Sequence, residues 1–245
     1  DFTGGRVGNL VVTRGHAVIP TLHVHGTVGQ FTGHIDGPMP DVMALIDLKP
    51  LQYPTKFGLD TKTTLGNAGI DLSIQVPMLA HNADKIGILV KAHVNDFAVT
   101  LGKLKIVNGD VDFTVDNNTL HQVGTIQLVD AKLNVDWVED LNSTLPITTH
   151  LNVKGQVTDA ARAALHIGLT DLLTGPVGTQ GTLTGYHGQL RAADLQLDLT
   201  PATVLIPIIH LGKPAGQAAQ ARVTINFGPD NALQDETLRV TGPNL

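Results

Sequence analysis

The chain has 245 residues, of which 42% are apolar and 16% charged, with a formal net charge of −6 and no cysteine. An electrostatic nucleic-acid binder needs a clustered basic face, so the acidic balance and the scattered lysines and arginines exclude nucleic acid as a partner. The lack of cysteine excludes disulfides, thiol catalysis and cysteine-based zinc sites. The 26 glycines and 13 prolines, with only 4% aromatic residues, indicate a turn-rich β protein with aliphatic apolar faces.

Neither a membrane-spanning run nor a targeting signal is visible in the sequence. No stretch of about 18 or more apolar residues occurs, so we expect no spanning helix in this chain. The chain begins at Asp1, without an initiator methionine or the apolar core of a signal peptide. We therefore expect a single β domain, residues 1–245, that is a fragment of a larger protein whose membrane anchor lies elsewhere.

Apolar and polar residues alternate in short runs from one end of the chain to the other. Successive side chains of a strand face opposite sides of a sheet, so each run has one apolar and one wet face. Turn residues between the runs predict antiparallel strands, and neighbouring strands form a meander between Val94 and Val138. In chain order the clearest runs are TLHVHGTV (21–28), IDLSIQVP (70–77), GDVDFTVD (109–116), KLNVDWV (132–138), HLNVKGQV (150–157), ADLQLDL (193–199) and RVTINF (222–227).

Turn-forming residues divide these runs. Asn108-Gly109 and the segment 116–118, Asp-Asn-Asn, are the strongest turn signals, because these residues tolerate the backbone conformations of tight hairpins. The glycine-rich string GTQGTLTGYHG (178–188) lacks the flanking strand and helix of a nucleotide site, and we interpret it as a hairpin connection.

Helical signals are few and short. Pro40 and Asp41 predict the start of a helix that runs through Asp47. Asp159 is the expected cap of a second helix, AARAALHI. A third helix, at 171–173, is a weaker possibility. The fold class expected is therefore mainly β, with one to three short helices.

The candidates for chemistry are histidines and carboxylates. His23 and His25 share a face of one predicted strand and would form half of a zinc or copper site. One hypothesis for the chain is therefore a metal-dependent hydrolase. No other ligand stands at a recognisable spacing, so we expect no metal. Asp110, Asp112 and Asp116 lie on a wet face and in its turn and lack the pattern of a calcium loop.

No sequence motif nominates a catalytic nucleophile or a phosphate-binding loop. We therefore predict a protein that is not an enzyme and has no catalytic residue and no cofactor. The candidate functional residues are instead the apolar members of the alternating runs. They are Leu22, Val24, Leu72, Ile74, Val76, Val111, Phe113, Val115, Ile126, Leu128, Leu133, Val135, Trp137, Leu151, Val153, Leu195, Leu197, Leu199, Val223, Ile225 and Phe227.

Four short segments in the second half of the chain carry a resemblance to a known family. They are GQVTDAA (155–161), GPVG (175–178), DLTPA (198–202) and KPAG (213–216). With the upstream stretch LIDLKPLQYPTKFGLDTKTTLGNAGIDLSIQVPML, the chain resembles the AsmA-like proteins of Gram-negative bacteria, in the YhdP-like branch, over roughly residues 41–227. These segments are structural rather than catalytic.

The AsmA-like resemblance implies a fold, a place and a function. The fold is an elongated antiparallel sheet that curls into a hydrophobic groove, a β-taco or open jelly-roll-like arrangement. The place is the periplasm, within a protein anchored at the inner membrane. The function is transport of lipid, phospholipid in particular, between inner and outer membrane, in support of outer-membrane biogenesis. Partners would come from the envelope proteins.

The alternating pattern is compatible with two arrangements of the apolar faces. The same alternation builds either an open groove that shelters an acyl chain or a closed β-sandwich whose two sheets bury each other about 10 Å apart. Periodicity alone favours the closed sandwich, which would serve as an interaction module without carrying lipid. The family resemblance favours the groove.

Overall fold

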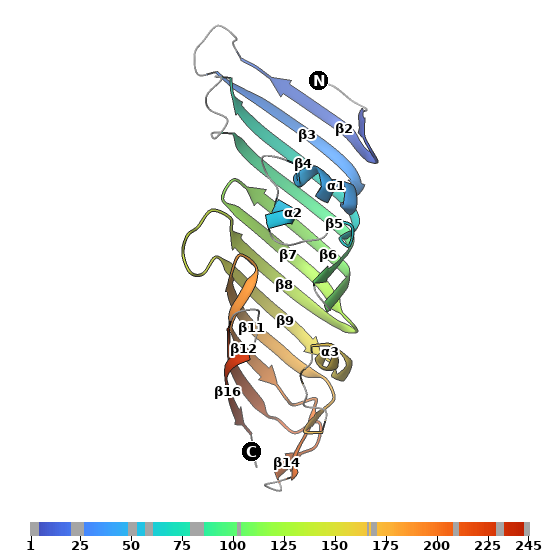
Figure 1. The fold of residues 1–245 in the computed structure, drawn as a ribbon. Helices are drawn as coiled ribbons and strands as arrows, with labels where there is room; N and C mark the ends of the chain where they lie inside the picture. The colour runs from blue at the N-terminus through green and yellow to red at the C-terminus, as the bar shows by residue number, and fades with distance from the viewer. Residues whose placement is uncertain are drawn as a thin grey trace.

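One large antiparallel sheet dominates the protein (Figure 1). The computed structural model describes residues 5–20, 27–48, 53–56, 61–78, 86–101, 104–165, 167, 171–207, 211–228 and 233–242. The sheet has 13 strands: β1 (Gly5–Val7), β2 (Leu10–Val18), β3 (Val28–Pro38), β4 (Leu65–Pro77), β5 (Gly87–Leu101), β6 (Leu104–Asp116), β7 (Thr119–Leu128), β8 (Ala131–Asp140), β9 (Thr149–Val157), β11 (Val177–Tyr186), β12 (Gln189–Asp198), β15 (Gln220–Phe227) and β16 (Leu233–Thr241).

The strand order in this sheet follows the order along the chain, and every neighbouring pair is antiparallel. The remaining strands, β10 (Leu173–Thr174), β13 (Thr203–Ile206) and β14 (Leu211–Lys213), form a second, three-stranded sheet near the C-terminal end of the large one. The large sheet is not closed. The predicted curled antiparallel sheet is therefore confirmed, and the described residues do not form the alternative, a sandwich of two large sheets.

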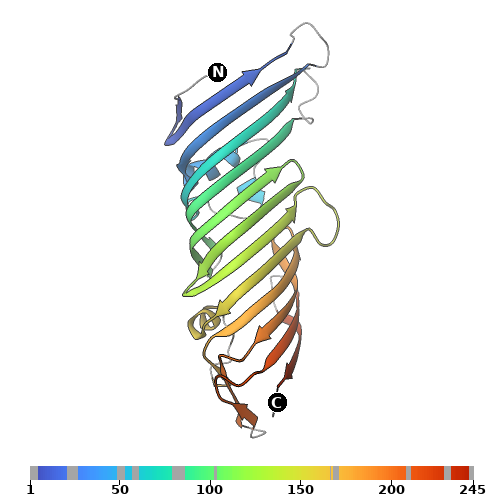
Figure 2. The same ribbon diagram turned by 180° about the vertical axis from the view of Figure 1, so that it is seen from behind.

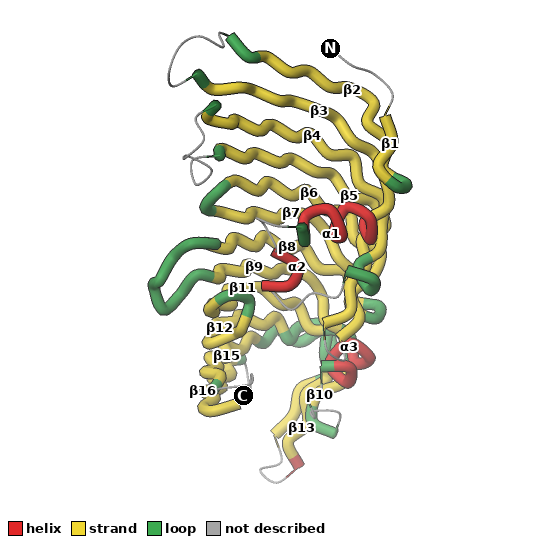
Figure 3. The backbone as a smooth tube through the Cα atoms, turned by 45° about the horizontal axis from the view of Figure 1, so that its top comes forward, coloured by secondary structure: helices red, strands yellow, loops and turns green. Residues whose placement is uncertain are grey.

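The large sheet curves, and its two ends do not meet (Figure 3). The strands at the C-terminal end turn toward the side on which α1 (Met39–Ile46) and α2 (Tyr53–Lys56) lie, as the opposite views in Figures 1 and 2 show. This is the concave side. Right-handed strand twist accumulates across a wide sheet and coils it in this way.

Close approach between strands explains two glycines. A Cβ atom at Gly124 of β7 would lie 2.2 Å from the carbonyl oxygen of Asp110 in β6, and one at Gly181 of β11 would lie 2.1 Å from that of Asp194. Most of the 178–188 segment belongs to strand β11, so the expectation of a hairpin connection there is wrong for most of its length. These glycines let the backbone of a regular strand approach its neighbour, and only the end of the segment turns.

The two turn predictions have different outcomes. Asn108-Gly109 lies inside β6 and makes no hairpin; Asn108 has a φ of 49° and sits at a shift in the β6–β7 register, which identifies a β-bulge. A bulge and a tight turn both need a residue that tolerates positive φ, so the dipeptide alone does not separate them. The second prediction is confirmed, because Asp116 accepts hydrogen bonds from the N–H groups of Asn118 and Thr119, both at 2.7 Å, in the β6–β7 turn.

The predicted helices are close to those observed. The helix expected at Pro40–Asp47 is α1, Met39–Ile46. The second is α3 (Asp159–Ala164), but Asp159 is not its cap: the side chain of Thr158 accepts from the N–H of Ala161. The 171–173 segment is not helical, and α2 was not predicted.

Two small cores cover parts of the apolar face, one toward each end of the sheet. At the N-terminal end, α1 places its buried residues, Met39, Val42 and Met43, against Val94 and Val111 of the sheet. At the C-terminal end, Val204 of the small sheet belongs to a cluster with Val177 and Ala221 of the large one and with Leu199, which follows β12. Neither cluster includes Trp137, Leu151 or Leu183 in the middle of the sheet.

A buried arginine fastens α3 to the small sheet. Arg162 is 6% exposed and donates to the carbonyl oxygens of Val157, Leu173 and Gly175, at 3.1, 3.3 and 3.0 Å. It also pairs with Asp159, whose carboxylate accepts from the N–H of Gly175. The planar guanidinium thus satisfies several backbone acceptors at once, which a lysine could not do.

Candidate functional site

Strand register assembles the predicted apolar residues on one face. Leu72, Val90, Val115 and Leu120 are successive cross-strand partners from β4 to β7. Partners on neighbouring strands share a face, and every second residue of a strand returns to it. By this rule all described members of the predicted set lie on one face; Leu22 and Val24 fall outside the described residues, as do His23 and His25.

This apolar face is the concave one. The buried side chains of α1 pack on Ala68, Ile70 and Val94, which belong to the same face, and α1 lies inside the curve of the sheet (Figure 3). The opposite, convex face carries the polar partners of each alternating run, including Asp110 and Asp112 as predicted.

Burial divides the apolar face into two kinds of position. Val111, Leu128, Val135, Leu199 and Val223 are at most 8% exposed and are ordinary core. The other described members of the predicted set are half-buried: Leu72, Ile74, Val76, Phe113, Val115, Ile126, Leu133, Trp137, Leu151, Val153, Leu195, Leu197, Ile225 and Phe227. A closed sandwich would bury such residues, so their partial exposure marks an apolar strip that the described residues cover incompletely.

The middle of the sheet lies outside both core clusters. Trp137, Leu151 and Leu183 are successive partners on β8, β9 and β11, all half-buried, and none belongs to either core cluster. Toward the two edges the apolar face opens further, with Phe31 36% and Leu238 55% exposed. The strip therefore crosses the sheet from β3 to β16 and is accessible along much of it.

Sequence reasoning missed two polar residues on the concave face, and the first is Glu139. Glu139 is fully buried, and it accepts hydrogen bonds from the hydroxyls of Thr148 at 2.8 Å and Thr149 at 2.5 Å. The indole N–H of Trp137 donates to it at 3.4 Å, and Nδ1 of His187 lies 3.7 Å away. The signal was present, because Glu139 follows Trp137 by two residues and alternation alone places it on the same face.

Gln122 is the second missed polar residue. It is the partner of Phe113 on one side and of Trp137 on the other, and it is 8% exposed. Its Nε2 atom is buried, and within the described part of the chain it has no hydrogen-bond partner. An unmatched amide in the middle of an apolar face is unusual, because buried polar groups are nearly always satisfied.

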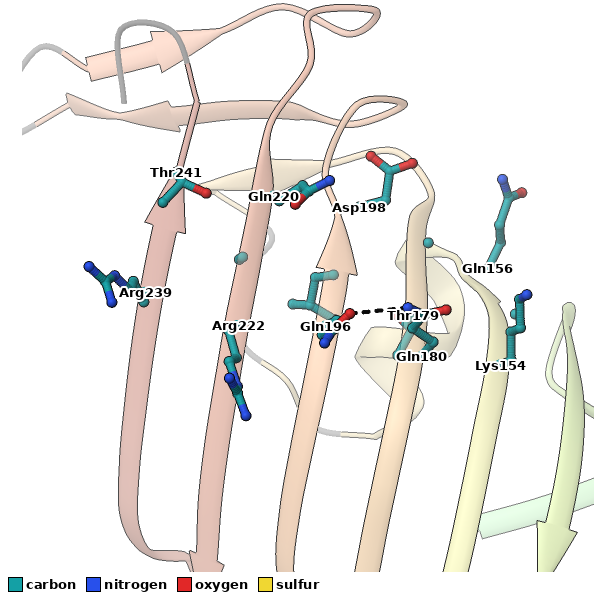
Figure 4. A pocket seen from close by; sticks show the side chains of 14 residues that line it. Lys154, Gln156, Thr179, Gln180, Gln196, Asp198, Gln220, Arg222, Arg239 and Thr241 are labelled. Atoms are coloured by element: carbon teal, nitrogen blue, oxygen red, sulfur yellow. Dashed lines mark hydrogen bonds between the residues drawn. The ribbon is translucent and has the colours of Figure 1, made fainter.

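Two shallow hollows lie on the polar convex face. The larger hollow has a volume of about 640 Å³ and crosses β9, β11, β12, β15 and β16. Figure 4 shows one row of its side chains, formed by the register partners Lys154, Gln180, Gln196, Arg222 and Arg239. Arg222 is held by Asp194, and Gln180 donates to Gln196 at 3.1 Å. These hydrophilic side chains keep the back of the sheet solvated, so the two faces differ sharply in chemistry.

Histidine–carboxylate pairs also lie on the convex face. His93 is 2.9 Å from Asp112, and this hydrogen bond raises the pKa of His93, with Asn95 and the carboxylate charges adding to the effect. The hydrogen bond with Asp71, at 2.8 Å, likewise raises the pKa of His34 and lowers that of Asp71. Cross-strand register places each histidine beside its carboxylate.

These pairs predict a pH dependence. A raised histidine pKa stabilises the fold below the ordinary value of about 6.5, and this contribution disappears as the pH rises through the folded-state pKa. We expect Asp112→Asn to lower the pKa of His93 toward its ordinary value and to destabilise the protein more at pH 5.5 than at pH 8.5. NMR titration of the histidine ring protons, with urea unfolding at both pH values, measures this. An unchanged His93 titration would contradict the pairing, and His34 serves as the unaffected internal control.

No metal site or spanning helix emerges from the described residues. Among them, no group of three or more histidine and carboxylate side chains is arranged to hold a metal ion. The helices in this part of the chain are all too short or too polar to cross a membrane. The metal-site hypothesis for His23 and His25 concerns residues outside the described ranges.

Comparisons with known proteins add no further identification. No protein-family model, no curated protein and no solved structure matches the chain. The resemblance to the AsmA-like family therefore stays a prediction from the sequence.

Proposed function

We propose that this chain is a non-enzymatic lipid-binding segment whose concave face holds acyl chains while they move between two membranes. The observation that carries the proposal is the half-buried apolar strip, which crosses an open sheet from β3 to β16. Its lining is aliphatic with a few aromatic rings. Such a surface binds hydrocarbon without selecting a particular chemical group, and it needs no catalytic residue.

The energetics are sufficient for acyl-chain binding. Removing hydrocarbon from water is worth about 0.8 kcal/mol per methylene, so about fifteen methylenes gain roughly 12 kcal/mol at full burial. A chain that lies on an open strip buries about half of its surface, and we expect roughly half of this gain. That affinity retains a lipid and still permits it to slide.

The setting follows from the AsmA-like resemblance. We propose that the segment belongs to an inner-membrane-anchored periplasmic protein and carries phospholipid between inner and outer membrane. No nucleotide motif occurs in the sequence, so the movement would be driven by a gradient or by a separate energised machine.

The single tryptophan provides a direct test. Trp137 lies on the concave face, half-buried, in the middle of the strip. We expect phospholipid with brominated acyl chains to quench its fluorescence strongly and saturably, because a bound chain would contact the indole. The measurement is fluorescence titration with purified, delipidated protein, together with native mass spectrometry of lipid that co-purifies.

A matched control moves the indole to the other face. Val138 is the next residue of β8 and points to the convex side, with 37% of its surface exposed. In the double variant Trp137→Phe, Val138→Trp, the brominated lipid should leave the fluorescence nearly unchanged. Equal quenching of both proteins, or none in the wild type, would refute lipid binding on the concave face.

A second candidate function is an interaction module for outer-membrane biogenesis. It is favoured by β16, which among the described strands pairs only with β15 and so presents an open sheet edge. Open edges recruit strands of other proteins. Protein that is consistently purified without lipid and takes up none from liposomes would support this candidate instead.

A further inference from the structure

Among the described residues of the concave face, one buried polar side chain has a group without a hydrogen-bond partner. Gln122 lies between Phe113 and Trp137 in the strand register, and its Nε2 has no hydrogen-bond partner among the described residues. The buried polar residues nearby are matched to one another, because Glu139 accepts hydrogen bonds from Thr148 and Thr149. The unmatched amide is therefore a local exception.

An unmatched buried amide destabilises the unliganded protein. Burying a donor without a partner costs the free energy of removing that donor from water. An apolar residue of similar size would avoid this cost. Gln122 nevertheless stands in a row of apolar residues, between Leu120 and Ile126 along β7. A ligand that supplies an acceptor to the amide would remove the penalty when it binds.

We propose that Gln122 recognises the ester-carbonyl region of an acyl lipid, which gives the strip specificity for ester-linked lipid. This inference rests on the proposed lipid-binding function and names the part of the lipid that is recognised. The terminal torsion of a glutamine amide is broad, so a rotation about it can turn the N–H toward the concave surface. A carbonyl oxygen accepts from it there, whereas a hydrocarbon chain does not.

Neighbouring groups fix where the rest of the lipid would lie. Leu120, next on the same face, is the partner of Glu139, so the polar groups of the concave face gather at this end of β7 and β8. In the other direction along β8 the face is apolar, through Val135 and Leu133. The ester region would therefore lie at Gln122, with the acyl chains over the apolar direction and the headgroup on the side of Glu139.

The test compares diester and diether phosphatidylethanolamine with the same chain lengths. Each lipid competes with the brominated lipid for Trp137, and recovery of fluorescence gives its relative affinity. We expect the wild-type protein to prefer the diester by roughly fivefold to a hundredfold, the range for matching one buried donor. Gln122→Leu should lose this preference and bind both lipids about equally, while unfolding at the same or a higher urea concentration than the wild type.

The control variant and the outcomes separate this inference from the function on which it rests. Val123→Thr changes the next residue of the same strand, which is 44% exposed on the convex face, and it should keep the diester preference. Displacement by both lipids with equal affinity in the wild type, or a preference that survives in Gln122→Leu, would overturn the role of Gln122 and leave lipid binding intact. Failure of either lipid to displace the probe, or failure of the probe to quench, would overturn lipid binding itself.

Discussion

Replacing Glu139 with alanine is expected to lower the free energy of unfolding by about 3–5 kcal/mol, one of the largest effects of any single substitution in this protein. The carboxylate is fully buried and accepts from Thr148 and Thr149. Those hydroxyls in turn accept from the backbone N–H groups of His187 and Gly188, at 2.8 and 2.9 Å. Removing Glu139 leaves both hydroxyl donors unmatched and opens a cavity, so the β11–β12 turn loses its attachment to β8 and β9.

The conservative variant provides the control for this prediction. Glu139→Gln keeps the volume of the side chain and one acceptor, and we expect it to lose less than half as much stability as Glu139→Ala. Urea unfolding followed by circular dichroism gives both values. An alanine variant within about 0.5 kcal/mol of the wild type, the size of an ordinary surface change, would mean that the network does not hold the turn.

Aspartate at two positions of the same apolar face should have opposite outcomes. Val94 is fully buried beneath α1, so Val94→Asp places an unpaired charge in the core and is expected to cost more than about 4 kcal/mol, enough to unfold a protein of ordinary stability. Leu151 is half-buried and outside both core clusters. Leu151→Asp should stay folded, because the carboxylate reaches water, but it should lose most of its bound lipid.

Asn152→Asp is the matched control for Leu151→Asp. It adds the same charge one residue further along β9, on the convex face, where the side chain is exposed and accepts from the hydroxyl of Thr182. It should keep both fold and lipid. The readouts are urea unfolding and lipid extracted per mole of protein. If Leu151→Asp unfolds as completely as Val94→Asp, the middle of the apolar face is a closed core and the proposed groove is wrong.

Local alternation made the faces of the sheet predictable. A side-chain period of two follows from strand geometry, so the residues that share a face with Trp137 or Val115 could be assigned without knowing which strands pair. The placement of Asp110 and Asp112 on the wet face followed for the same reason. The short helix near Pro40 was predictable because proline in the first turn is a local signal.

Other features depend on contacts that no local pattern contains. Asn108-Gly109 suits a hairpin turn as well as a bulge, and only the register with β7 separates the two. Thr158 and Asp159 are both good helix caps, and the choice was made by Arg162 and Gly175, which engage the carboxylate of Asp159. Whether the apolar face is open or closed depends on the curvature of the whole sheet. The missing hydrogen-bond partner of Gln122 is likewise a property of its surroundings.

The agreement between strand order and chain order has a consequence for the growth of such a protein. In a sheet whose strand order departs from the chain order, a strand contacts elements that are distant along the chain, so an inserted hairpin disturbs several of them. Here each strand contacts mainly the one before it and the one after it, so an added hairpin disturbs only its two neighbours. Each such addition would lengthen the apolar strip by about 9–10 Å, twice the spacing of adjacent strands. The span that this architecture bridges is thus set by the number of hairpins, and it can change in small steps while the chemistry of both faces stays the same.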